Sequence, residues 1–190
     1  PDDSTFGRFG HAALCVFAPE EPDGQCFNYG AAHARAGLAR DVLLGRARFW
    51  VKPEPYSFVI EYYRGQGRRI RAQALSMSPE EITRVVNLLA HDAAAENSEY
   101  LCDPLRNNCS TRSRDVLDAA SFGRLHQATV GTLSVRSYRD VLLQALGESF
   151  VALAALDLLV GEEADRPLDA WDAMVAPDGL YDGVALGLAP

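Results

Sequence analysis

Apolar residues in the first half of the chain occur in short runs that turn-forming residues separate. Residues 10–17 and 25–30 are mostly apolar, and the stretch 19–24 between them contains Pro and Asp-Gly, so a β-hairpin is predicted here. Residues 56–63 are rich in aromatic and β-branched side chains, and residues 68–75 alternate between polar and apolar positions. Both patterns are typical of strands, so a second hairpin is predicted after the first.

The clearest helix signal is a capping box formed by Ser78 and Glu81, with Pro79 at the first helical position. The apolar spacing after it predicts a helix that ends near residue 95. Before it, residues 40–51 are predicted to form a helical turn followed by an extended piece. The side chains expected to face the core from the helix are Ile82, Val85, Val86, Leu89 and Ala93.

The second half of the chain is predicted to be mostly helical. Helices are expected over residues 111–120, 137–146 and 148–160, and shorter helical pieces are expected around Trp171 and Tyr181. Strands that come first and helices that follow are typical of an α+β fold.

The chain of 190 residues has no internal repeat and no low-complexity linker, so a single domain is expected. Its core is predicted within about residues 6–122, and a helical C-terminal extension within about 132–185. Hydrophobic residues make up 48% and charged residues 23%, which is ordinary for a globular protein. The net charge of -8 argues against a nucleic-acid partner, which usually requires a basic surface.

No apolar run approaches the roughly 18 residues that a membrane-spanning helix needs. The longest stretch, residues 150–160, is shorter and contains Asp157. The chain begins at Pro1 without a secretion-signal pattern, which indicates a processed or trimmed product. Association with a membrane is therefore expected to depend on segments that this sequence does not include.

The four cysteines allow two kinds of pairing. Cys15 and Cys26 fall on the two strands of the first predicted hairpin, where a disulfide needs Cα atoms within about 7 Å; free thiols are the alternative. Cys102 is expected to fill core volume rather than to form a disulfide with Cys109. The chain has no CxxC and no HxxxH pair, so no metal site and no cofactor are expected.

Cys109 stands where a loop meets a predicted helix, and the positive end of a helix dipole favours a thiolate. Its own backbone N–H and the side chain of Asn108 are candidate donors to an oxyanion. His11, at the head of the first predicted strand, is the candidate base. The alternative is structural, because buried cysteines and histidines on apolar strands most often only pack.

A third polar group is needed to orient the imidazole of His11. If the strands of the first hairpin pair antiparallel, Asn28 falls opposite His11 on the same face, where its side-chain oxygen can accept the imidazole N–H. Tyr29 then points to the opposite face, but a slip of one residue in register exchanges the two. Asn28 is therefore the preferred third residue, and Tyr29 is the alternative.

Four motifs in order, FGHAAL, CFNYG, NNCSTRSRD and ADRPLDAWDAM followed by PDGL, resemble the Lnb N-terminal domain family of bacterial lipoprotein N-acylation transferases. The resemblance spans His11 to about Tyr181. It implies a circularly permuted papain-like fold, similar to lecithin:retinol acyltransferase, with an antiparallel sheet packed on helices and the His strand before the Cys helix. It also assigns the nucleophile to Cys109 and the base to His11, and implies an extracytoplasmic location in a bacterium.

Arg114 also lies in the NNCSTRSRD motif. Its planar guanidinium is suited to binding a phosphate or a carboxylate. The favoured interpretation is an ion pair with Asp115 that braces the helix. Asp165, Arg166 and Trp171 are expected to dock the C-terminal helices.

A cysteine nucleophile passes an acyl group through a thioester to an acceptor. The resemblance implies transfer of a fatty acyl group from a lipid ester to an amine, with a lipid or a lipoprotein as substrate. One alternative is a peptidase or amidase of cell-wall or peptide substrates, which predicts a polar cleft. Another is a non-catalytic binding module, which predicts an ordinary thiol. The acyltransferase predicts an apolar groove lined by Leu14, Phe58, Ile60 and Tyr62.

Overall fold

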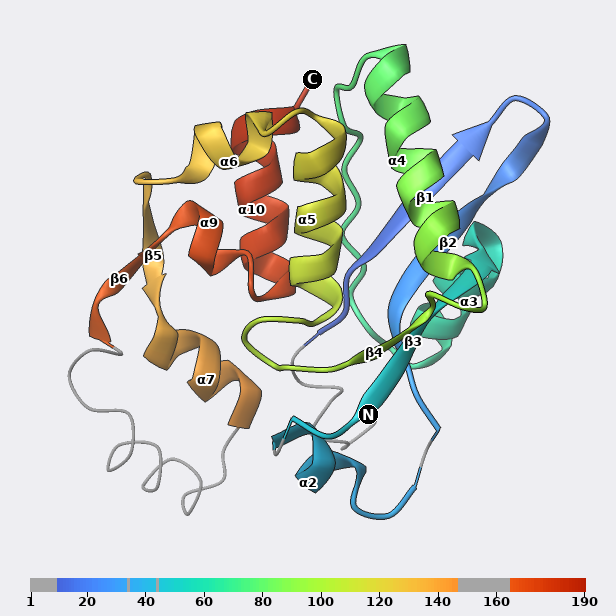
Figure 1. The fold of residues 1–190 in the computed structure, drawn as a ribbon. Coiled ribbons are helices and arrows are strands. Elements are labelled where there is room, and N and C mark those ends of the chain that lie inside the picture. The colour runs from blue at the N-terminus through green and yellow to red at the C-terminus, as the bar shows by residue number, and fades with distance from the viewer. Residues whose placement is uncertain (1–9, 34, 44, 147–164) are drawn as a thin grey trace.

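The computed structural model describes residues 10–33, 35–43, 45–146 and 165–190. Its centre is a four-stranded antiparallel sheet in the order β1-β2-β3-β4 (Figure 1). The pairing of β1 with β2 confirms the first predicted hairpin, and the elements after it confirm the helical turn and extended piece. The elements are β1 (Ala13–Ala18), β2 (Glu21–Ala31), α2 (Leu38–Leu43), β3 (Arg48–Pro55) and β4 (Glu99–Leu101).

Helices pack on both faces of this sheet. On one face α4 contacts β3 and α5 contacts β2, and α10 packs beside α5 together with α6 (Figure 1). On the other face α3 contacts β2 and β3. The bounds are α3 (Tyr56–Gly65), α4 (Pro79–Ala93), α5 (Cys109–Ala120), α6 (Arg124–Thr129) and α10 (Pro177–Leu188).

The side chains of β2 alternate between the two faces. Phe27 and Tyr29 belong to the main core, which α5 shares through Val116 and Leu117. Asn28 lies between them in sequence and borders a cavity shared with α3. This alternation separates a hydrophobic face from the face that carries the polar groups of the candidate site.

The remaining elements are α7 (Tyr138–Leu146), α9 (Ala170–Ala173) and a two-stranded sheet of β5 (Leu133–Ser137) and β6 (Pro167–Asp169). The helices expected near residues 137–146, Trp171 and Tyr181 are confirmed, whereas the small sheet was not predicted. The helix expected over 148–160 lies outside the described residues. Among the described helices, none is both long enough and apolar enough to cross a membrane. The α+β class is confirmed; the circular permutation stays a prediction.

The second predicted hairpin is wrong. Residues 56–63 form most of helix α3, which starts directly after Pro55 ends β3. Strand propensity is a weak preference that tertiary context overrides, and here the helical spacing buries Val59 and leaves Phe58 and Tyr62 about half exposed. Residues 68–75 are extended but pair with no described strand, because the partner they were expected to have is a helix.

Helix α4 begins as predicted. Ser78 accepts the backbone N–H of Glu81, and the Glu81 carboxylate accepts the backbone N–H of Ser78, which completes the capping box. Val85 and Leu89 are buried, but Ile82 remains 47% exposed and borders a cavity rather than the core. The predicted core face is therefore only partly confirmed.

The PDGL motif has a packing role. A Cβ atom on Gly179 would lie 1.8 Å from the backbone oxygen of Ala173, so only glycine permits this close approach of α10 to α9. Helix α10 thereby reaches the main core, to which it contributes Leu180, Val184 and Leu188.

Candidate active site

Cys109 is the first residue of α5, and Asn108 is the N-cap. Asn108 Oδ1 accepts hydrogen bonds from the backbone N–H groups of Ser110 (2.8 Å) and Thr111 (3.0 Å). Asparagine is among the preferred N-cap residues, so the local sequence starts the helix at Cys109. The thiol therefore lies at the positive end of the helix dipole.

The amide nitrogen of Asn108 is engaged in structural contacts. Its Nδ2 donates to the backbone carbonyls of Pro104 (2.7 Å) and Val175 (3.0 Å), so the expectation that it stabilises an oxyanion is wrong. The bond to Val175 ties the start of α5 to the turn between α9 and α10. Within the described part of the chain, the backbone N–H of Cys109 has no acceptor, and it remains the candidate oxyanion donor.

His11 lies just before β1 and next to Asn28 of β2. In the strand register Ala13 pairs with Asn28, so His11, two residues earlier, is on the same side of the sheet. Asn28 Oδ1 is 3.1 Å from His11 Nε2. Because a carboxamide oxygen only accepts hydrogen bonds, Nε2 carries the proton, and Nδ1 is left for the hydrogen bond with Cys109.

Asn28 is held in turn by Glu54 of β3, which sequence reasoning missed. Asn28 Nδ2 is 3.2 Å from Glu54 Oε2 and 3.4 Å from the backbone oxygen of Lys52. Lys52 Nζ forms an ion pair with Glu54 Oε1 at 2.6 Å. No local sequence signal marks Glu54, because its role depends on the pairing of β2 with β3.

The pKa values of Cys109 and His11 are shifted in opposite directions. Burial alone raises the pKa of Cys109, but the hydrogen bond and the charge of His11 lower it below the ordinary value of a thiol. The backbone N–H of Ala12 and the Ser110 hydroxyl lower it further. Burial alone lowers the pKa of His11, but the hydrogen bond and the charge of Cys109, with the Asn28 contact, raise it. These directions favour a thiolate–imidazolium pair.

Tyr63 of α3 packs on the imidazole. The ring centroids of His11 and Tyr63 are 5.9 Å apart, with 27° between the planes. Burial, with a smaller contribution from the charge of Cys109, raises the pKa of Tyr63 to about 12, so the phenol stays neutral near neutral pH. The charge of Arg68 opposes protonation of His11. Both Tyr63 and Arg68 fall in segments predicted as strands, which is why their place beside His11 was missed.

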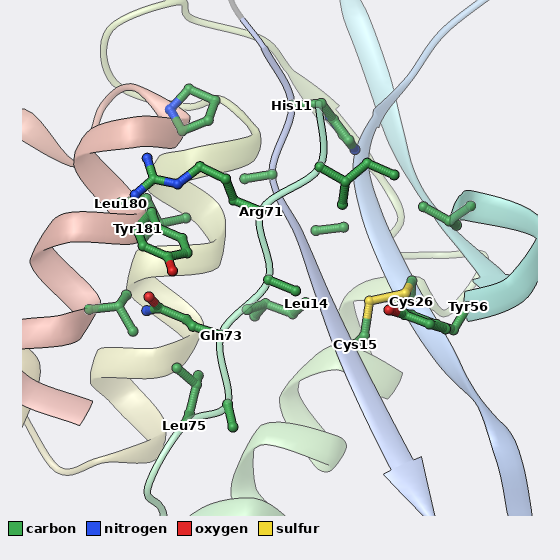
Figure 2. A pocket seen from close by; sticks show the side chains of 18 of the residues that line it. His11, Leu14, Cys15, Cys26, Tyr56, Arg71, Gln73, Leu75, Leu180 and Tyr181 are labelled. Carbon is green, nitrogen blue, oxygen red and sulfur yellow. A yellow bond between two sulfur atoms is a disulfide. The ribbon is translucent and has the colours of Figure 1, made fainter. Parts of the chain in front are cut away.

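A cavity of about 950 Å³ lies beside β1, between this strand and the extended segment 68–77, and reaches α3 and α10 (Figure 2). His11 stands near one end of it and Leu75 near the other. Of the groove residues predicted from sequence, Leu14 and Ile60 line this cavity, whereas Phe58 and Tyr62 line a neighbouring one of about 400 Å³. Apolar residues along the larger cavity include Leu14, Val16, Ile70, Leu117, Leu180 and Val184.

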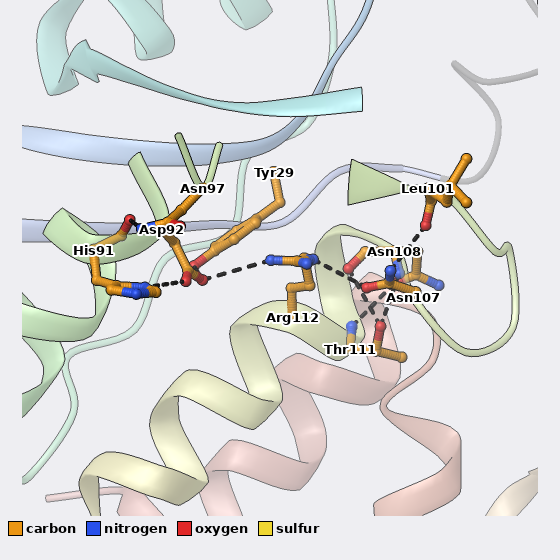
Figure 3. A network of polar contacts seen from close by, with 9 residues as sticks. All are labelled: Tyr29, His91, Asp92, Asn97, Leu101, Asn107, Asn108, Thr111 and Arg112. Atoms are coloured by element: carbon orange, nitrogen blue, oxygen red, sulfur yellow. Dashed lines mark hydrogen bonds and ion pairs between the residues drawn. The ribbon is translucent and has the colours of Figure 1, made fainter. Parts of the chain in front are cut away.

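Tyr29 lies on the opposite face of β2 and does not reach His11. It is fully buried, and its hydroxyl donates to Asp92 Oδ2 of α4 at 2.8 Å (Figure 3). Arg112 Nη1 lies 3.6 Å from the same oxygen, and Arg112 Nε donates to Asn107 Oδ1 at 3.0 Å. A role of Tyr29 in orienting the imidazole or in binding a substrate is therefore wrong. Its contacts tie β2 to α4 and α5.

Replacing Tyr29 by phenylalanine is expected to lower the free energy of unfolding by about 1–2 kcal/mol, because the Asp92 carboxylate loses a hydrogen bond in a mostly buried position. The alkylation rate of Cys109 is expected to stay within about twofold of wild type, because the two sites share no direct contact. Urea unfolding measures the first effect and mass spectrometry the second. Slower alkylation at unchanged stability would place Tyr29 in the site after all.

Arg114 braces the helix as the favoured interpretation predicts. Its Nη2 lies 2.8 Å from Asp115 Oδ1, and its guanidinium lies 4.1 Å from the ring centroid of Trp171. With this side chain only 14% exposed, its alternative role as a substrate-binding residue gains no support. Asp165 pairs with Arg139 of α7, which agrees with the expected docking role of this region.

Cys15 and Cys26 face each other in the β1–β2 register and form a disulfide, with Cα atoms 3.9 Å apart. Both residues border the larger cavity. Cys102 and Cys109 are free thiols. Burial raises the pKa of Cys102 to about 12, so this thiol stays protonated near neutral pH. The pKa of Cys109, in contrast, is lowered.

Comparison with known proteins gives a match to a protein family. The family model described as the Lnb N-terminal periplasmic domain matches residues 3–144. No curated protein and no solved structure matches the chain significantly. Among the residues that the structure describes, no three His, Cys, Asp or Glu side chains gather as a metal site requires.

Proposed function

The chain belongs to the Lnb N-terminal periplasmic domain family, and on this premise we propose that it is a cysteine-dependent acyltransferase. In this proposal it takes a fatty acyl group from a lipid ester and passes it to an amine, as in the N-acylation of a lipoprotein. A periplasmic domain lies outside the cytoplasm, and the Cys15–Cys26 disulfide agrees with an oxidising location. The observation that carries the proposal is the Cys109–His11 pair together with the mostly apolar cavity that His11 lines.

The first half of the reaction follows from the protonation states of the pair. The Cys109 thiolate attacks the ester carbonyl carbon, and the backbone N–H of Cys109 stabilises the oxyanion that forms. The C–S bond forms and the C–O bond breaks, while protonated His11 gives its proton to the leaving alkoxide. Asn28 keeps Nε2 engaged, so Nδ1 is the nitrogen that transfers the proton.

The shape and lining of the larger cavity support a lipid donor. The apolar side chains of Leu14, Ile70 and Leu180 are among its walls, and a fatty acyl chain gains about 0.8 kcal/mol for each buried CH₂ group. Arg68 and Arg69 add positive charge to the lining, which is suited to a phosphate-bearing head group. The hydrolase of peptide substrates predicted a polar cleft, and a mostly apolar cavity favours the acyltransferase instead.

Incubation with a medium-chain p-nitrophenyl ester is expected to add one acyl group to Cys109, which intact-mass and peptide mass spectrometry detect. Cys109→Ser is expected to show no acyl adduct at this position, because a serine hydroxyl is a much weaker acid than a thiol and stays neutral beside His11, so the oxygen ester does not form at a comparable rate. Cys102→Ser is the matched control and is expected to acylate like wild type, since the Cys102 thiol does not ionise near neutral pH. A wild-type protein that forms no adduct at Cys109 would contradict the proposed function.

A further inference from the structure

The carboxylate of Glu54 contacts the end of the Asn28 amide that does not face His11. Asn28 pairs with Lys52 across β2 and β3, and Glu54 is two residues further along β3, so the three side chains lie on one face of the sheet. The Glu54 side chain is only 17% exposed, and Asn28 is buried. Carboxylates are rarely covered to this extent unless they are paired, so the contacts of Glu54 indicate its role.

The two ends of the Asn28 amide differ in chemistry, and only one orientation lets His11 act as a base. Oδ1 accepts the Nε2–H of His11, which leaves Nδ1 to take the proton of the Cys109 thiol. A half-turn of the amide would place Nδ2, which only donates, against Nε2. The neutral ring would then carry its proton on Nδ1 and would have no nitrogen left for the thiol proton.

The contacts of Asn28 Nδ2 distinguish the two orientations. Nδ2 donates to Glu54 Oε2 at 3.2 Å and to the backbone oxygen of Lys52 at 3.4 Å. Both partners only accept hydrogen bonds, so after a half-turn Oδ1 would face two oxygens, and neither contact would have a proton. The bond to Glu54 is the stronger of the two, because it is shorter and charge-assisted. Glu54 therefore contributes most to holding Oδ1 toward His11.

The second oxygen of Glu54 is also bound. Lys52 Nζ lies 2.6 Å from Glu54 Oε1, so the ammonium group and the Asn28 amide bind different oxygens of one carboxylate. A carboxylate satisfies both donors in this way, whereas a glutamine side chain has only one acceptor oxygen. This difference allows the role of Glu54 to be tested by a substitution that preserves its shape.

We propose that Glu54 is a positioning residue that fixes the orientation of the Asn28 amide and thereby keeps Nδ1 of His11 available to the Cys109 thiol. The inference rests on the proposed function, because it concerns the proton transfer that prepares the nucleophile. Glu54 forms no bond to the substrate and exchanges no proton with it. It acts on the protonation of His11 through Asn28.

The pH profile of Cys109 alkylation by iodoacetamide tests this role. Glu54→Ala is expected to slow alkylation at about pH 6.5 about threefold to tenfold, which corresponds to the loss of one hydrogen bond, and to move the rise in rate to higher pH. Asn28→Ala removes the group through which Glu54 acts, so adding Glu54→Ala to it is expected to slow alkylation less than about twofold further. A purely structural role would lower the free energy of unfolding, measured with urea, without moving the pH profile.

Glu54→Gln is expected to slow alkylation by a similar factor although it preserves the shape of the side chain. Its acceptor oxygen faces the Lys52 ammonium, because a bond to a charged donor is the stronger one. Its amide nitrogen then faces Asn28 and favours the half-turn of the Asn28 amide. In a Lys52→Met background the glutamine oxygen is available to Asn28 Nδ2, and there Glu54→Gln is expected to change the alkylation rate less than about twofold.

Glu99→Gln is the matched control. Glu99 of β4 also forms an ion pair across the sheet, with Arg48 of β3, and it is not among the residues that line either cavity. Its pH profile is expected to equal that of wild type.

Two results would overturn the positioning role while leaving the cysteine–histidine pair in place. One is a wild-type profile in both Glu54→Ala and Glu54→Gln. The other is a slowing by Glu54→Gln that persists in the Lys52→Met background, which would assign the effect to the charge of Glu54 instead. A wild type without fast alkylation below about pH 7 would overturn the proposed function itself, and this inference with it.

Discussion

Replacing His11 by alanine is expected to slow the alkylation of Cys109 at least about tenfold at about pH 6.5. In the native protein the hydrogen bond and charge of His11 hold the pKa of Cys109 below its ordinary value despite burial. An ordinary thiol with a pKa of about 8.5 is only about 1% ionised at about pH 6.5. Without the imidazole, burial is the largest remaining influence, and it raises the pKa of the thiol.

The sign of the pH dependence follows from these directions. A thiol with a lowered pKa keeps its thiolate as the pH falls below about 8.5, so alkylation of the wild type is expected to remain fast below about pH 7. In His11→Ala the rise in rate is expected to move to a pH above the ordinary value. A thiolate with a low pKa is intrinsically less nucleophilic, which reduces the difference in alkylation rate between wild type and His11→Ala. The larger ionised fraction in the wild type increases this difference by more than the lower nucleophilicity reduces it.

The measurement is iodoacetamide labelling across pH, with peptide mass spectrometry to assign each thiol. Cys102 is an internal control in every sample, because burial raises its pKa to about 12 and it should label slowly in both proteins. A wild-type profile that rises only near pH 8.5, and that His11→Ala does not change, would indicate a non-catalytic binding module. Asn28→Ala is expected to give an intermediate profile, since it removes the group that holds Nε2 but leaves the imidazole in place.

The parts of the site that the sequence predicts are those with a local cause. The start of α5 at Cys109 follows from the N-cap asparagine at position 108, and the contact between His11 and Asn28 follows from the period of two in a hairpin. Tyr29 falls on the opposite face for the same reason. In each case one short segment contains all the information that the prediction needs.

The parts that the sequence does not predict depend on contacts between distant segments. Tyr63 reaches the imidazole only because residues 56–65 are helical, and their aromatic and β-branched composition favours a strand. Glu54 reaches Asn28 through the pairing of β2 with β3, which no local pattern specifies. The side-chain amide of Asn108 could donate to an oxyanion, as its chemistry suggests. In the structure its N–H donates instead to the backbone carbonyl of Val175, which is far along the chain, and no local pattern predicts this contact.

Cys109 and His11 come from separate parts of the fold, and different contacts hold each part in place. Helix α5 is fixed by the Asn108 link to the α9–α10 turn and by the Arg114 contact with Trp171. The strand that follows His11 is fixed by its ladder with β2 and by the Cys15–Cys26 disulfide. Of these contacts between described residues, only the disulfide is covalent. Its removal is therefore expected to lower the free energy of unfolding more than the loss of any of the others.

The double variant Cys15→Ser, Cys26→Ser is expected to lower the free energy of unfolding by about 3 kcal/mol. The disulfide joins residues 11 positions apart, and closing a loop of about a dozen residues restricts the unfolded chain by about this amount. For a chain of this length the loss corresponds to a fall in Tm of about 6–12 °C. Urea unfolding and thermal melting of the oxidised wild type and the double variant measure both quantities.

The same variant separates a stabilising role of the disulfide from a role in the chemistry. The ladder between β1 and β2 extends from Ala13 to Ala18 and holds Asn28 beside His11 without the disulfide, so Cys109 alkylation is expected to stay within about threefold of wild type under native conditions. Cys102→Ser, which breaks no disulfide, is the control and is expected to lose less than about 1 kcal/mol. A loss below about 1 kcal/mol in the double variant would show that the hairpin is already ordered in the unfolded chain, because the disulfide would then restrict little. A collapse of Cys109 reactivity at retained folding would instead make the disulfide a part of the site.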